Sequence, residues 1–316
     1  MSAYVLRRLW LLVPALFGMS LLVFFMLRLL PGDIVDVMTG GDIPATAGSK
    51  ERLREAFGLD QPLPVQYVSW LSKMAHGDLG TSFRSGEPIS TILVRTLPVT
   101  MELTLLAVVV ATLVAIPLGV ISAVARESGF DYVARLAGLI GLSMPNFWLA
   151  TLMLLFTSAI LHWIPPVNWI PLFQDPVGNL RQMALPAAAI ALQLMAILMR
   201  MTRTMMLEVL QQDYVRTARA KGAVERLVVF RHALRNALIP VVSVIGFQIG
   251  ALMGGSAIVE VIFGLNGIGN TLVQAIFNRD YPVVQATTLF VAVVFVFANL
   301  GVDLLYGYLD PRLKHA

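Results

Sequence analysis

Six long runs of the chain contain no charged residue, and each is long enough to cross a membrane as a helix. They are 18 to 26 residues long and cover residues 9–27, 103–125, 136–161, 182–199, 236–259 and 281–302. A helix rises about 1.5 Å per residue, so about 20 residues span the hydrocarbon of a bilayer. Because lipid offers no partners for backbone amides, the runs are predicted to be helices.

Composition places these runs in an integral membrane protein. Of 316 residues, 57% are hydrophobic and 13% are charged, whereas about a quarter of a soluble domain is charged. The net charge of +4 does not indicate nucleic-acid binding, because the basic residues cluster at the ends of the apolar runs. The absence of cysteine excludes disulfides, thiolate metal sites and cysteine nucleophiles.

The distribution of Lys and Arg predicts the orientation in the membrane. Six crossings place both termini on one side, and with both ends inside, 14 Lys and Arg face the cytoplasm. Excluding the long loop between the first two runs, only Arg181 and Arg279 face outward. The positive-inside rule therefore predicts cytoplasmic N- and C-termini. The first run follows Arg7 and Arg8 without a small-residue cleavage site, so we expect a retained anchor.

The loop of residues 29–98 is the one sizeable extracytoplasmic segment that this orientation leaves. Helical signals occur at residues 50–57, 64–74 and 89–96. We expect these short helices to lie on the membrane and cover the bundle, a position that is compatible with a docking role.

Glycine and proline punctuate the apolar segments. A seventh uncharged run, residues 261–278, is predicted to be a surface or re-entrant segment because it is rich in Gly and Asn (Gly264, Asn266, Gly267, Gly269 and Asn270). Pro14, Pro117, Pro145 and Pro186 fall in or beside spans, where proline is common. Gly246, Gly250 and Gly254 form a small-residue stripe that fits close packing within the chain and a subunit interface equally well.

The motifs of common enzyme sites are missing. The dipeptide Gly-Lys does not occur, so there is no P-loop, and the four histidines are scattered. No Gly-x-Ser-x-Gly sequence occurs. We therefore expect no catalytic residue, no metal ligand and no cofactor-binding residue. Glu102, Glu260 and Asp303 lie near span ends, where hydrated or paired structural groups are commoner than ion relays.

The basic segment at residues 200–239 is the expected functional surface. Eight Lys or Arg and three Asp or Glu lie between Arg200 and Arg235. Ala218 and Gly222 share one face of a predicted helix, where small side chains would let a partner approach, among the cations Arg216, Arg219, Lys221 and Arg226. Partner docking and a basic loop that only fixes topology are equally compatible with this pattern.

Several motifs resemble one family of transport proteins. Residues 213–222 read Asp-Tyr-Val-Arg-Thr-Ala-Arg-Ala-Lys-Gly, and residues 231–240 read Arg-His-Ala-Leu-Arg-Asn-Ala-Leu-Ile-Pro. Both resemble the EAA loop of bacterial ABC importer permeases, in the branch of dipeptide, oligopeptide and nickel permease B subunits. Residues 4–9, 30–33, 77–82, 143–148, 259–269, 279–282 and 309–312 are also similar to that family.

Two positions depart from the family pattern. Arg216, Thr217 and Ala218 stand where the general motif has Glu-Ala-Ala, and Asn266 stands where proline is usual before Gly267. The first departure makes the general motif degenerate, and the second concerns only the local turn before Gly267.

The resemblance implies a MetI-like type I importer fold in the bacterial inner membrane, with one permease domain over residues 1–316. It implies a second, homologous permease subunit, two ATP-binding cassette subunits that hold ATP and Mg, and an extracytoplasmic substrate-binding protein. It assigns the coupling contact with the ATPases to Tyr214, Arg216, Thr217, Ala218, Arg219, Lys221 and Gly222.

The expected function is ATP-driven import of di- or oligopeptides. Within the family, nickel, glutathione or another small solute is the alternative cargo. From other classes, an ion-coupled secondary carrier acting alone and a membrane scaffold without transport remain as rivals.

Overall fold

Among the residues that the computed structural model describes, five helices are long and apolar enough to cross a membrane. They are α1 (Ser2–Arg28), α5 (Ile89–Val124), α8 (Pro176–Leu210), α11 (Arg235–Gly255) and α14 (Tyr281–Leu309). The structure describes residues 2–28, 35, 54–55 and 60–309. Within them, extended pairing is limited to one isolated bridge between Thr81 and Pro88. The all-α membrane fold is confirmed. Two bent helix pairs could raise the number of spans to seven, so the count of six remains a prediction.

The third uncharged run is broken, and our expectation of one continuous helix over residues 136–161 is corrected. α6 (Gly129–Ser143) and α7 (Asn146–Leu161) are inclined to each other by 100°. Met144 is extended, with ψ at 122°, and Pro145 precedes α7. Proline disfavours helical geometry at the residue before it, which explains the break. Pro14, Pro117 and Pro186, by contrast, lie inside continuous helices.

The seventh run also forms a bent pair. α12 (Ala257–Phe263) and α13 (Ile268–Phe277) are inclined by 86°. Gly264 ends α12 in the left-handed conformation, with φ at 64°, which glycine adopts without steric cost. A broken span or a re-entrant loop has this geometry, and a re-entrant segment is one of the two forms expected for residues 261–278.

The core lies where α5 packs along α8. α5 buries a small or apolar residue at every fourth position, namely Leu103, Ala107, Ala111, Ala115 and Gly119. A Cβ added to Gly119 would lie 2.8 Å from the carbonyl oxygen of Met199 on α8. Small side chains therefore let the two backbones approach closely.

The glycine stripe of α11 faces α14. A Cβ at Gly246 would overlap the Val302 side chain. One at Gly250 would lie 3.0 Å from a ring carbon of Phe295, and one at Gly254 would lie 3.1 Å from Val291. The structure thus places the stripe in a packing contact within the chain.

The loop between the first two runs has two described helical parts. α4 (Leu63–Ala75) corresponds to the helix expected at residues 64–74, and its Tyr67 hydroxyl lies 2.7 Å from the Ser20 hydroxyl of α1. The helix expected at residues 89–96 is not separate, because α5 starts at Ile89, after Pro88, and runs on through Pro98 to Val124. Most of the helix expected at residues 50–57 lies outside the described residues.

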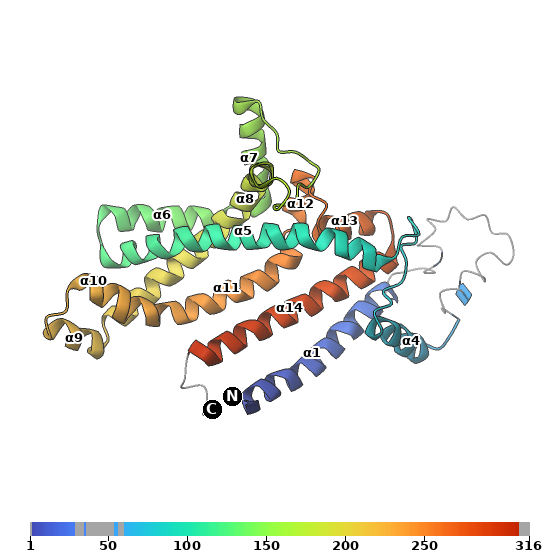
Figure 1. Cartoon of the computed structure of the whole chain (residues 1–316), viewed down its shortest axis with the longest axis horizontal. Helices are drawn as coiled ribbons and strands as arrows, with labels where there is room; N and C mark the ends of the chain where they lie inside the picture. The colour runs from blue at the N-terminus through green and yellow to red at the C-terminus, as the bar shows by residue number, and fades with distance from the viewer. Residues whose placement is uncertain (1, 29–34, 36–53, 56–59, 310–316) are drawn as a thin grey trace.

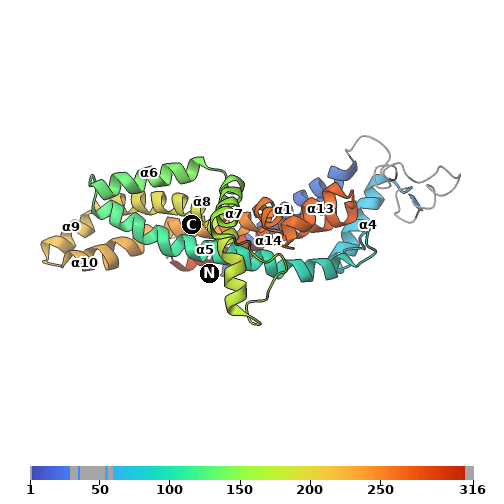
Figure 2. The ribbon, with the colours of Figure 1, turned by 90° about the horizontal axis from the view of Figure 1, so that it is seen from above.

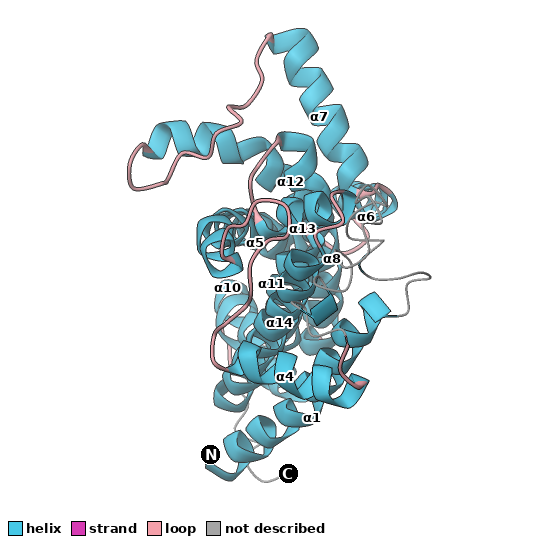
Figure 3. Cartoon of the chain, turned by 90° about the vertical axis from the view of Figure 1, so that its right-hand side faces the viewer, coloured by secondary structure: helices cyan, strands magenta, loops and turns pink. Residues whose placement is uncertain are grey.

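The arrangement separates two ends of the bundle (Figure 1). Beyond α8 and α11 lie α9 (Asp213–Ala220), α10 (Glu225–Leu227) and the π-helix η1 (Val228–Leu234), here called the α9 end. α4 lies at the opposite end, as the view from above also shows (Figure 2). α7 projects to one side of the bundle (Figure 3). α1 and α14 pack in opposite directions, so the described start of α1 and end of α14 lie close together.

Candidate functional site

The predicted coupling residues lie together at the α9 end. Five of the seven are on α9, and Lys221 and Gly222 follow it directly. α8 continues into the predicted loop as far as Leu210, and α11 begins at Arg235, so a short helical hairpin fills the space between them.

One face of α9 anchors it to the rest of the chain. Val215 is fully buried. The Tyr214 hydroxyl accepts a hydrogen bond of 2.8 Å from the Asn236 side-chain amide, and it lies 3.4 Å from the carbonyl oxygen of His232. Ala218, one turn after Val215, is half-buried on the same side. We had expected Ala218 to lie on the face open to a partner, and the structure places it beside the anchor.

The opposite face of α9 is open. Thr217 and Ala220 are exposed and point away from Val215 by helical periodicity, and Arg216, beside them, is exposed too. Gly222 follows at φ 81°, with open space around the position of a Cβ. The Gly222 amide donates to the Arg219 carbonyl oxygen at 2.9 Å, and the Ala223 amide donates to that of Ala218 at 3.2 Å. These bonds end the helix in a defined turn.

The cations on α9 and directly after it differ in their partners. Arg219 donates two hydrogen bonds, of 2.6 and 3.1 Å, to the Glu225 carboxylate. This contact raises the pKa of the Arg219 guanidinium, because the carboxylate stabilises its charged form. Arg216 lies 3.7 Å from Asp213. Lys221 forms no ion pair with the part of the chain that the structure describes, so its charge is available to a partner.

A buried ion pair supports the α9 end. Asp131 at the start of α6 is fully buried and accepts two hydrogen bonds from Arg203 of α8, of 2.7 and 2.9 Å. The Ser122 hydroxyl of α5 also donates to Asp131, at 2.5 Å. Three helices are thereby joined at this end. We did not predict this pair from the sequence, although the Ser-x-x-Asp pattern at Ser128, which caps α6, was a usable signal.

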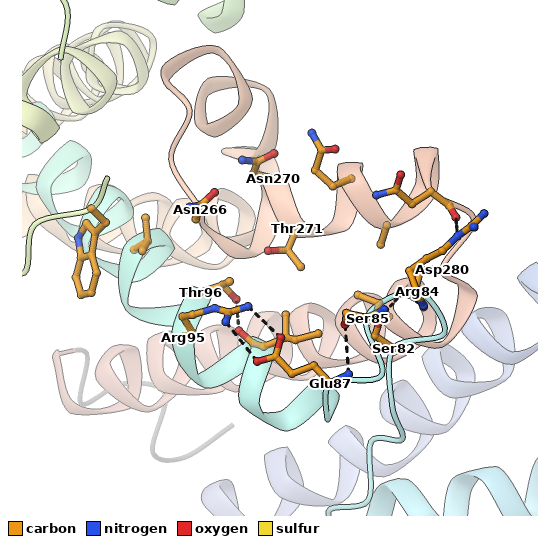
Figure 4. Close-up of a pocket in the computed structure, with 17 residues that line it drawn as sticks. Ser82, Arg84, Ser85, Glu87, Arg95, Thr96, Asn266, Asn270, Thr271 and Asp280 are labelled. Atoms are coloured by element: carbon orange, nitrogen blue, oxygen red, sulfur yellow. Dashed lines mark hydrogen bonds and ion pairs between the residues drawn. The ribbon is translucent and has the colours of Figure 1, made fainter. Parts of the chain in front are cut away.

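A cavity of about 690 Å³, lined by both polar and apolar side chains, lies at the other end of the bundle (Figure 4). Its polar lining comes from the segment before α5, from the start of α5 and from α13 with its preceding turn, and includes Ser82, Arg84, Glu87, Arg95, Thr96, Asn266, Asn270 and Thr271. We call this region the cavity end. Sequence reasoning did not identify it, although Asn266 and Asn270 had marked the seventh run as unusual.

Buried carboxylates hold the cavity walls. Asp280 accepts hydrogen bonds from the Ser82 hydroxyl and from the Phe83 and Arg84 amides. Glu260 is fully buried. It accepts hydrogen bonds of 2.8 Å from the Thr100 and Ser256 hydroxyls and one of 2.9 Å from the backbone amide of Asn270. Each carboxylate joins segments far apart in the sequence, so the walls are rigidly positioned.

Of the other two acidic residues near span ends, Glu102 and Asp303, the structure describes the side chain of Glu102 alone. Glu102 accepts hydrogen bonds from the Trp169 indole at 2.9 Å and from the Asn179 amide. With Glu260, it is a hydrogen-bonded group that joins helices and loops. The Asp303 side chain lies outside the described ones. Among the described residues, no three His, Asp or Glu side chains are grouped to hold a metal ion.

Comparison with protein families gives two matches that together cover most of the chain. The family described as "Binding-protein-dependent transport system inner membrane component" matches residues 115–315. Its N-terminal counterpart matches residues 1–104.

Individual relatives match over the full length. A Brucella abortus protein named as a peptide transport system permease is 44% identical, with 100% of both chains covered. The oligopeptide transport system permease of Bacillus subtilis is 40% identical, also with full coverage of both. Among solved structures, the inward-facing MetNI methionine ABC transporter matches 71% of this chain and 99% of its own, with a TM-score of 0.58 and 19% identity. That likeness shows the fold alone.

Proposed function

Because the chain belongs to the family of binding-protein-dependent transport system inner membrane components, a family of ABC importer permeases, we propose that it carries peptides across the bacterial inner membrane, driven by ATPases that engage α9. As a multi-pass permease subunit, it works with other ABC components. We propose that these are a second permease, two ATP-binding cassette subunits and an extracytoplasmic binding protein.

The exposed face of α9 is the observation that carries the coupling proposal. α9 is a short helix at the tip of the bundle, fixed on one side by Val215 and Tyr214 and open on the other. A partner can grip Arg216, Thr217 and Ala220 without unfolding the chain. Because η1 leads directly into α11 and α8 leads into α9, movement of α9 pulls on two long helices.

The proposed ATP-binding sites lie on other chains. It contains no P-loop, so we propose that ATP and Mg bind to the partner chains and that this subunit has no catalytic residue. ATP-driven closure of the ATPases would displace α9 and change which side of the membrane the pathway faces. A cargo is pumped only if its contact energy differs between the two states.

Peptides are the proposed cargo because of the relatives. Full-length relatives at 40–44% identity are named as peptide, dipeptide or oligopeptide permeases. The structural feature that agrees is a cavity at the end opposite α9, with charges of both signs in its lining.

Reconstitution tests the proposal. Proteoliposomes that contain the complete set of subunits should accumulate radiolabelled alanylalanine when ATP is present on the ATPase side. Proteoliposomes with this chain and its permease partner alone should accumulate none, with or without a proton or sodium gradient. Accumulation without ATPases would overturn the coupling proposal, and ATP-driven uptake of another solute but no peptide would overturn the proposed cargo.

A further inference from the structure

The cavity end has the charge pattern of a ligand site. Resting on the proposed import of peptides, we infer that the cavity is a binding subsite for short peptides with free termini. In this subsite Arg95 binds the peptide carboxylate and Glu87 binds its ammonium group, while asparagine side chains meet the peptide bond. The nearest polar neighbours are labelled in Figure 4.

The ion pair in the cavity is loose. Two guanidinium nitrogens of Arg95 each lie 3.3 Å from an oxygen of Glu87. Charge-assisted N–H···O bonds are usually about 2.7–2.9 Å long. The side chains are 65% and 30% exposed, so water screens the attraction and little is lost when they separate. A ligand with opposite charges at its two ends can therefore replace each partner with one of its own groups.

The uncharged lining fits the backbone of a peptide. Asn270 lines the cavity, its amide nitrogen donates to the Leu265 carbonyl at 2.9 Å, and its side-chain oxygen is buried with no hydrogen-bond partner among the described residues. A buried acceptor without a partner is unfavourable, so a turn of the Asn270 side chain that brings this oxygen to the N–H group of a ligand in the cavity would be stabilised. Asn266 and Thr271 add further polar groups beside it.

The cavity walls are held in place by hydrogen bonds, and their apolar parts accept peptide side chains of different kinds. Glu260 holds the backbone amide of Asn270, and Asp280 holds the segment of Ser82 and Arg84, so little ordering is required on binding. Trp169 and Ile92 supply apolar surface, which accommodates different peptide side chains without selecting one. The volume of about 690 Å³ lies within the roughly 300–1,000 Å³ of small-molecule sites.

Binding of alanylalanine to the assembled permease–ATPase complex, without the binding protein, tests the inference. Saturation-transfer NMR on the complex in nanodiscs should show saturable binding to the wild type. Alanylalanine with an acetylated amino end and an amidated carboxyl end should not compete. Arg95→Met and Glu87→Gln should each weaken binding about tenfold, the loss expected for one charged hydrogen bond at a half-exposed site.

The matched control is an exposed ion pair at the other end of the molecule. The side chains of Arg126 and Glu127 lie 3.1 Å apart, outside the cavity, so Arg126→Met with Glu127→Gln should bind alanylalanine as the wild type does. Equal binding by the cavity variants, or equal competition by the capped peptide, would overturn the inference. If the wild-type complex transports peptides but binds none here, only the subsite fails. If it transports no peptide at all, the proposed function fails.

Discussion

α9 and the cavity lie at opposite ends of the bundle and differ in the burial of their residues. At the α9 end, Arg216, Thr217 and Ala220 are exposed, and one buried valine anchors the helix. At the cavity end, the carboxylates of Asp280 and Glu260 are buried and hydrogen-bonded to segments far away in the sequence. The exposed face of α9 suits a contact with a partner that moves. The buried carboxylates of the cavity end suit a wall that keeps its shape.

Near α9, the bundle also contains a buried carboxylate that is hydrogen-bonded to other segments, as at the cavity end. Asp131 and Arg203 form a buried, two-bond ion pair just inside the bundle from α9. The exposed helix thus lies beside a rigid support, and we expect a displacement of α9 to be passed to α5, α6 and α8. This comparison yields four predictions, which run from complete loss of transport to a modest loss of ATPase association.

Ala220→Trp should abolish ATP-driven uptake, with a loss of at least about a hundredfold, which corresponds to roughly 2.7 kcal/mol. The indole would occupy the open face of α9, where a partner must approach, while the fold stays intact because Ala220 is exposed. Uptake by proteoliposomes and gel filtration of the purified chain measure the two effects. Ala220→Ser, which stays small, should transport normally; normal transport by the tryptophan variant would show that this face is not the contact.

Asp131→Ala should destabilise the protein by about 3–5 kcal/mol, because Arg203 would be left as a largely buried cation without its partner. Thermal unfolding of the purified chain in detergent measures the loss. The double variant Asp131→Ala with Arg203→Met should recover part of it, since both charges are then gone. If the single and double variants melt alike, the pair is not the support that we describe.

Gly246→Ala should cost about 1–3 kcal/mol, because a methyl group there would overlap Val302 on α14. Gly255 lies on the same helix, and beyond its own helical turn no atom lies within 4 Å of an added Cβ, so it is the control. Its alanine variant should leave the melting temperature unchanged or slightly higher. Equal melting of the two variants would argue against close contact between α11 and α14.

Lys221→Glu should weaken ATPase association about threefold to tenfold, with a smaller effect at high salt, as expected for an exposed charge at an interface. Lys221 forms no ion pair within the described residues, so the change disturbs no internal contact. Co-purification of the ATPases over a salt series gives the measurement. Lys73→Glu, the same charge change at the opposite end on exposed α4, should have no effect.

The sequence predicted what depends on local pattern. Uncharged runs located the long helices, and the basic segment located α9, because hydropathy and charge act over short stretches. We did not predict the continuous helix from Ile89. Pro98 is tolerated inside α5, and polar residues precede the uncharged run of residues 103–125, so the sequence suggested a later start. The break at Met144 was present in the sequence as Pro145, yet similar prolines at 14, 117 and 186 leave their helices intact.

The contacts that define both ends could not be predicted. Asp131 and Arg203 are 72 positions apart, and Ser82 and Asp280 are 198 apart. Such pairs depend on how the helices pack against each other, which a single sequence does not reveal. The exposed face of α9 likewise follows from the burial of Val215, which makes Ala220, rather than Ala218, the small residue open to a partner.

Cysteine cross-linking at α9 tests the central claim most directly. The chain has no cysteine, so Ala220→Cys introduces a single reactive site. In the assembled complex a short reagent with a maleimide at one end and a photoactivated diazirine at the other should link position 220 to an ATP-binding cassette subunit, and ATP should change the yield. The same reagent on Ser90→Cys, exposed at the start of α5, should give no such product. An ATPase cross-link from position 90 and none from position 220 would contradict the account.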